Sequence, residues 1–323
     1  MQNLIDPAIL FFIFGVIAGA LKSNLEIPPA IAKFLSLYLL MALGLKGGFA
    51  LVQSGIDASI AISLAAAIAM AFIVPALGYT YLKTRVAKFD AAAVAASYGS
   101  VSAVTFVTAT QILEASGMTF GGHMTAAMVL MEFPAIVTAV LLANSIRHQQ
   151  KASKGDTSTS TSLGKIMHES FTDGAQLLLL GSMVIGFISG EVGKTMMQPF
   201  AGDLFKGLLS FFLLDMGLMV ARNFTEAKKT SATLIAYAAV GPLVHAGIAL
   251  ALAVLLEMPV ADAAMLMVLS ASASYIVVPA VLRYAIPEAN PSLYFGLSLG
   301  VTFPLNILFG IPLYMYAAKA VLG

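Results

Sequence analysis

The chain has 323 residues, of which 59% are hydrophobic and only 10% are charged, and its formal net charge is +1. Its mean hydropathy is +0.93, whereas soluble domains carry about 25% charged residues, so the composition excludes an ordinary soluble protein and indicates an all-α integral membrane protein. The chain contains no cysteine, which excludes disulfides and thiolate metal sites, and the small net charge gives no reason to expect a nucleic-acid partner.

Hydrophobic segments recur along the whole chain. A membrane-spanning helix needs about 20 mostly apolar residues. The segments that qualify are 7–22, 34–52, 58–82, 90–114, 123–146, 172–190, 204–221, 231–256, 262–282 and 292–317. Residues 148–170 between the fifth and sixth segments are polar and rich in Ser, Thr and Lys, which is typical of a solvated linker. We therefore predict ten spans in two five-span halves, 1–147 and 171–323, joined by this linker.

Basic residues predict the orientation, because they are retained in cytoplasmic loops. When the loops are assigned alternately to two sides, the side that contains the linker carries most of the lysines and arginines. The opposite loops carry only Lys194, Lys206 and Lys319. We therefore predict a multi-pass protein of the plasma (inner) membrane, with both termini outside and the linker in the cytoplasm.

The two halves resemble each other at a shift of about 170 residues. Asp90 aligns with Asp262, and Pro134 aligns with Pro304. Chance similarity between apolar helices could explain any single match. Several matches at one nearly constant shift make chance a poor explanation. Because each half has an odd number of spans, the second half enters the membrane from the opposite side, which predicts an inverted repeat.

The fourth and ninth spans carry repeat-related serines near the middle of the membrane. Both Ser-x-Ser pairs lie about ten residues from the entry end, which is about 15 Å deep at 1.5 Å per residue. Because the two spans enter from opposite faces, we expect them to cross there, near mid-membrane. Gly99, and Pro279 beyond the second pair, favour interrupted helices. The alternative is that these hydroxyls bond to their own helices or allow close helix packing. The substrate-binding residues that we predict are Gly99, Ser100, Ser102, Ser272 and Ser274.

Three further residues are predicted to hold a coupling ion. Glu132 lies within the fifth span, where an ionisable side chain is costly and is functional by default. It could bind a cation, carry a proton or pair with a neighbour. Thr105 and Thr302 lie in the fourth and tenth spans and complete this predicted set.

The remaining intramembrane polar residues have structural and functional interpretations. Lys46 and Asp215 lie in repeat-related spans, which predicts an ion pair between them; a titratable gate is the alternative. His245 could relay protons, although a packing role is the simpler interpretation. Histidines and carboxylates show no transition-metal spacing, so we expect no transition-metal site.

Several motifs resemble the sodium-dependent bicarbonate permeases of the SbtA type. The matching stretches are LGLKGGFAL at 43–51, EFPAIVTAVLLAN at 132–144, PLVHAG at 242–247, VLRYAIPEANPSLYFG at 281–296 and the Ile-Pro-Leu of 311–313. The resemblance implies ten spans with inverted five-span repeats and one domain that carries substrate past a second domain. It also implies bicarbonate at the junction of the fourth and ninth spans, sodium beside it, and a homo-oligomer such as a trimer.

The chain departs from this family pattern at the predicted site. Ala103 and Val104 replace a glycine and a serine, and Tyr275 replaces an acidic residue, which predicts weaker sodium binding because hard cations prefer charged oxygen ligands. Glu132 stands where the family has an aspartate.

We therefore predict a secondary transporter of a small anion, with sodium-dependent bicarbonate uptake by alternating access as the leading function. The alternatives are a carrier of another small solute, coupled to protons, and a membrane sensor that binds a ligand without transport. We expect no enzymatic activity and no cofactor. The expected coupling ion is Na⁺, and the expected partners are the small anion and the lipid bilayer.

Overall fold

The computed structural model describes residues 7–323 except 55–57, 153–173, 228–230, 276, 277, 279, 280, 283 and 284. Most of the predicted linker and Pro279 therefore lie outside the described residues. The described part is helical and contains no strand. Its α-helices are α1 Pro7–Ala20, α2 Pro29–Ser54, α3 Ala58–Leu82, α4 Lys88–Gly99, α5 Ala103–Ala115, α6 His123–Ala152, α8 Gly174–Met197, α9 Phe205–Ala227, α10 Ala232–Leu255, α11 Val260–Ala271, α13 Pro291–Leu297, α14 Phe303–Leu305 and α15 Ile311–Leu322. Its π-helical segments are η2 Gln198–Asp203, η3 Ser298–Thr302 and η4 Asn306–Gly310.

The helices have the length and composition of membrane spans. Seven segments in the described part are long and apolar enough to cross a membrane, and α1 and α11 are shorter apolar helices. Each of the ten predicted segments overlaps a helix, which confirms the all-helical architecture. Their arrangement as ten spans in an inverted repeat stays a prediction.

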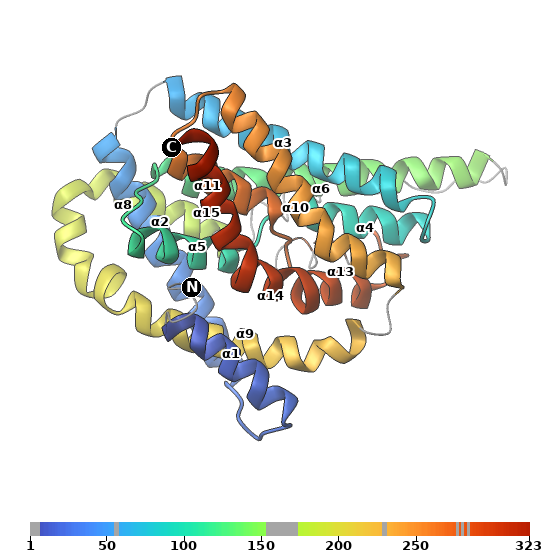
Figure 1. Ribbon diagram of the computed structural model, residues 1–323, viewed down its shortest axis with the longest axis horizontal. Coiled ribbons are helices and arrows are strands. Elements are labelled where there is room, and N and C mark those ends of the chain that lie inside the picture. The colour runs from blue at the N-terminus through green and yellow to red at the C-terminus, as the bar shows by residue number, and fades with distance from the viewer. Residues whose placement is uncertain are drawn as a thin grey trace.

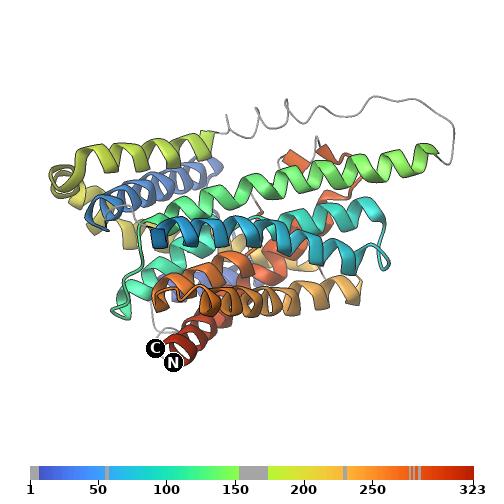
Figure 2. The same ribbon diagram turned by 90° about the horizontal axis from the view of Figure 1, so that it is seen from above.

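The helices form two groups. In one group α1 packs along α9, and α2 packs along α8. The other group contains α3, α4 and α6 together with α10, α11 and α15. Figure 2 shows α2 and α8 side by side at one end of the molecule, with the long α6 extending from near them toward the opposite end. The described parts of both sequence halves contribute to each group.

Glycines allow the helices of the first group to approach closely. A Cβ atom on Gly217 of α9 would overlap the Phe12 carbonyl oxygen of α1. A Cβ atom on Gly186 of α8 would lie 2.6 Å from the Leu45 carbonyl oxygen of α2. Such small-residue contacts are the usual way in which helices pack in a membrane, where burial of apolar surface provides little drive.

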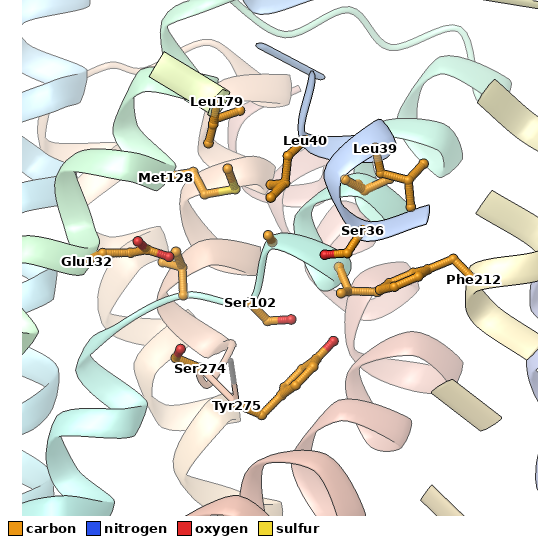
Figure 3. Close-up of a pocket in the computed structure, with 14 residues that line it drawn as sticks. Ser36, Leu39, Leu40, Ser102, Met128, Glu132, Leu179, Phe212, Ser274 and Tyr275 are labelled. Atoms are coloured by element: carbon orange, nitrogen blue, oxygen red, sulfur yellow. The ribbon is translucent and has the colours of Figure 1, made fainter. Parts of the chain in front are cut away.

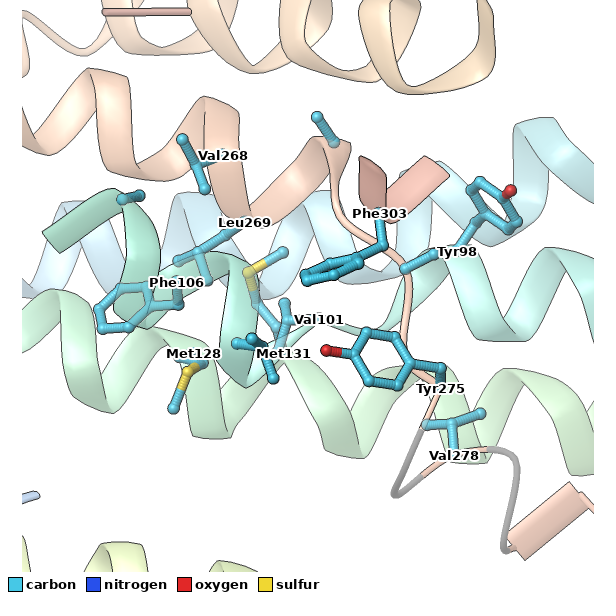
Figure 4. Packing of buried hydrophobic residues seen from close by; sticks show 14 of the residues in the cluster. Tyr98, Val101, Phe106, Met128, Met131, Val268, Leu269, Tyr275, Val278 and Phe303 are labelled. Carbon is cyan, nitrogen blue, oxygen red and sulfur yellow. The ribbon is translucent and has the colours of Figure 1, made fainter. Parts of the chain in front are cut away.

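Two helices end within the centre of the second group. The fourth predicted span is broken between α4 and α5, and α11 ends at Ala271. Apolar side chains from both regions pack around these breaks (Figure 4). Phe303 of α14 packs edge-on against Tyr275, with ring centroids 5.5 Å apart. Non-helical backbone at this depth is tolerated because protein surrounds it.

Candidate functional site

The two chain breaks cross each other and exchange hydrogen bonds. The Ser274 backbone N–H donates to the Ser97 carbonyl oxygen at 2.8 Å. The Ser102 backbone N–H donates to the Ser272 hydroxyl at 3.0 Å. The structure therefore brings together the two serine pairs that the sequence placed at one depth. These bonds satisfy backbone groups that the interrupted helices leave open.

The serine hydroxyls hold the broken ends in place. The Ser102 hydroxyl accepts from the Thr105 backbone N–H at 3.1 Å and so caps the N-terminus of α5. The Ser272 hydroxyl donates to the Leu269 carbonyl oxygen at 2.8 Å. Ser100 is buried, and its hydroxyl has no hydrogen-bond partner among the described atoms. Ser100 therefore has an unused hydrogen-bond donor beside the crossing. A buried hydroxyl without a partner is costly.

Gly99 is required for packing at the break. A Cβ atom there would lie 2.6 Å from the Pro75 ring of α3. Gly99 thus lets α4 end directly against α3. Gly99 does not line the cavity that opens beside the crossing.

A cavity of about 50 Å³ opens beside the crossing, between the two helix groups (Figure 3). This volume accommodates a few waters or one small polyatomic ion. Its polar lining residues are Ser36 of α2, Ser102, Glu132 of α6, Ser274 and Tyr275. Figure 3 shows the hydroxyls of Ser102 and Tyr275 directed into the space that faces α2.

The N-terminus of α5 also faces this cavity. Ser102, Ala103 and Val104, the cap and first residues of α5, are all lining residues. The first amides of a helix carry a partial positive charge and bind anions. The cavity therefore combines positive backbone dipoles and hydroxyls with one carboxylate, Glu132, which suits an anion that travels with a cation.

Of the three residues predicted to hold the coupling ion, only Glu132 lines the cavity. The Thr302 hydroxyl donates to the Ala238 carbonyl oxygen at 2.7 Å and lies 2.5 Å from the Tyr98 hydroxyl oxygen. Thr105 is buried in the first turn of α5. These two threonines support the helices around the cavity.

His245 is buried beside two tyrosine rings. Its ring centroid lies 6.5 Å from that of Tyr98 and 6.2 Å from that of Tyr237. This aromatic cluster lies apart from the cavity lining, so its geometry is that of a packing histidine.

The predicted ion pair between Lys46 and Asp215 is wrong. Lys46 Nζ lies 3.3 Å from Glu114 Oε1 and 4.5 Å from the centroid of the Phe205 ring. The reason is the helix packing: Lys46 meets α9 at Phe205, the first residue of that helix, whereas Asp215 lies ten residues, about 15 Å, further along it and is buried there. Among the described residues, no group of three or more His, Asp or Glu side chains could hold a metal ion.

Asn306 is a functional candidate that the sequence analysis missed. Its side-chain amide donates to the Ala271 carbonyl oxygen at 2.8 Å, at the broken end of α11. Its oxygen accepts from the Tyr314 hydroxyl at 2.9 Å. The signal in the sequence was an amide within an apolar span, two residues after Pro304, at the start of a π-helical turn.

Two interrupted chain segments that cross beside a small cavity, in a bundle of membrane-length helices, are typical of membrane transporters. Residues 7–319 match the Na⁺-dependent bicarbonate transporter superfamily. The chain belongs to this superfamily, which confirms the resemblance seen in the sequence motifs. A search of curated proteins finds no match.

Proposed function

We propose that this protein takes up bicarbonate together with Na⁺ across the plasma membrane by alternating access. The observation that carries the proposal is the cavity at the crossing, because its hydroxyls and helix N-terminus suit a small anion. Bicarbonate is planar, small and rich in hydrogen-bonding oxygens, so Ser102 and Ser274 are suitable partners for it. Glu132 is the suitable partner for the coupling ion.

The proposed transport cycle rests on an inverted repeat. In support, Asp90 Oδ1 accepts from the Asn290 backbone N–H at 2.8 Å, and Asp262 Oδ1 accepts from the Gly121 backbone N–H at 2.7 Å. These two aspartates occupy equivalent positions in the two halves and hold equivalent loops. In the cycle that we propose, the group containing the crossing moves past the group of α1, α2, α8 and α9.

A second candidate is a proton-coupled carrier of another small anion. Tyr275 supports it, since a phenol lies at the cavity where the family resemblance implies an acidic residue. A protonatable Glu132 would then carry the coupling ion. A sensor would bind the same ligand without moving it.

The test is uptake of labelled bicarbonate into proteoliposomes that contain the full chain. We expect uptake driven by an inward Na⁺ gradient and lost when choline replaces Na⁺. Uptake that follows the pH gradient and ignores Na⁺ would instead support the second candidate. Saturable binding without uptake would identify a sensor, and neither binding nor uptake would reject bicarbonate as the ligand.

A further inference from the structure

A second cavity, of about 120 Å³, lies between α2, α5 and the loop that leads to α6. Its polar lining residues are Lys46, Thr110, Glu114, Thr119 and Thr125. In the orientation predicted from the basic residues, this loop lies on the outer side of the membrane. None of these residues belongs to the crossing site.

The two cavities follow the same two helices. On α2, Leu39 and Leu40 line the first cavity, and Leu43 lines the second. On α5, Val107 lines the first and Thr110 lines the second. Spacings of three and four residues place these side chains on one face of each helix. The two cavities therefore lie in succession along the α2–α5 interface.

Lys46 is held in the second cavity by an exchangeable partner. Its ammonium lies between the Phe205 ring and the Glu114 carboxylate, and the side chains of Lys46 and Glu114 are 30% and 43% exposed. Ion pairs of this exposure contribute little net stability. A carboxylate is also close in shape and charge to bicarbonate. An incoming bicarbonate can therefore replace Glu114 as the partner of Lys46 at small cost.

Along α5, Gln111 lies between Val107, which lines the first cavity, and Glu114, which lines the second, and it is in the lining of neither. It is one helical turn from Val107 and one residue from Thr110, and its side chain is 3% exposed. Neither its amide nitrogen nor its amide oxygen has a hydrogen-bond partner among the described atoms. An unpartnered buried amide is costly, which indicates that a ligand or a water serves as its partner.

We propose that the second cavity is the outer vestibule of the transporter, in which Lys46 captures the incoming anion by exchange with Glu114. Gln111 then hydrogen-bonds the anion on its way to the crossing. This inference rests on the proposed function for the identity of the anion. The attraction of anions to the vestibule is testable without it.

The kinetic test compares Lys46→Gln with Glu114→Gln in uptake of bicarbonate by intact cells. Loss of the charged donor should raise the half-saturating concentration about tenfold. Loss of the competing carboxylate should lower it up to about fivefold. Opposite shifts distinguish this role from a structural ion pair, which either substitution would break. Lys194→Gln, which breaks the exposed Lys194–Glu191 pair on α8, should leave the value unchanged. Shifts in the same direction, or no shift, would overturn the proposal.

Gln111→Leu separates transport from folding. An apolar side chain of similar size should leave thermal stability unchanged or raised, because it removes an unpartnered amide. The maximal rate of uptake should nevertheless fall. A variant with full uptake would remove Gln111 from the path.

Because the chain contains no cysteine, a single Thr119→Cys provides a clean probe of the vestibule. We would measure its reaction rates with a negatively charged and a positively charged methanethiosulfonate. The ratio of anionic to cationic rates should fall when Lys46→Gln is added and rise when Glu114→Gln is added. At Thr195→Cys on α8 the same substitutions should leave the ratio unchanged. An unaltered ratio at Thr119→Cys would overturn the vestibule even if bicarbonate is transported. Altered ratios without bicarbonate uptake would reject only the proposed cargo.

Discussion

Ser102 combines two roles in one residue: it caps α5 and lines the first cavity. We predict that Ser102→Ala abolishes transport, because it removes a hydroxyl from the proposed site, and that it lowers stability by about 1 kcal/mol, the usual cost of a lost cap. Thr108→Val is the matched control, since Thr108 is a buried hydroxyl of the same helix that bonds only to the Val104 carbonyl oxygen in the described structure. Labelled uptake and thermal unfolding in detergent would measure both effects, and undiminished uptake by Ser102→Ala would rule out its role.

Helices α1 and α9 approach each other closely because a glycine lies at their contact. Gly217 faces the Phe12 carbonyl oxygen, whereas a Cβ atom on Gly207 of the same helix would have no atom within 4 Å. We predict that Gly217→Ala lowers the free energy of unfolding by about 1–3 kcal/mol through overpacking. Gly207→Ala should raise it by about 0.5–1 kcal/mol, because alanine is the better helix former. Thermal melting would compare them, and equal shifts would contradict close packing of the two helices.

Across the whole molecule, Arg147 at the end of α6 joins the two sequence halves. It donates from Nε and Nη2 to the two Glu288 carboxylate oxygens at 2.8 and 2.7 Å. This pairing lowers the pKa of the Glu288 carboxyl. The stabilisation is therefore complete above the ordinary glutamate value of about 4.3 and is lost as the pH falls through the lowered value. We predict that the melting temperature falls more between pH 5 and pH 3 in the native chain than in Glu288→Gln, and parallel curves would contradict it.

Particular residues show how far sequence reasoning reached. The positions of the spans followed from apolar segments, because a bilayer demands about 20 such residues whatever the fold. The meeting of the Ser100–Ser102 and Ser272–Ser274 segments followed from depth and repeat. The partner of Lys46 did not follow, because helix rotation depends on packing between distant segments. Asn306 was overlooked because its partner, the Ala271 carbonyl, is exposed only by a break in α11.

Local composition and local motifs were sufficient to predict the membrane class, the helices, the transporter family and the two segments that carry the crossing. Packing between distant segments sets which hydroxyls face the cavity, places Glu132 in its lining and Thr302 outside it, and pairs Lys46 with Glu114. The physical reason is that YGSVSAV at 98–104 and its repeat partner satisfy each other's backbone groups only when the two helices are folded together. Ala103, Val104 and Tyr275, the positions at which the family resemblance implies other residues, all line the resulting cavity.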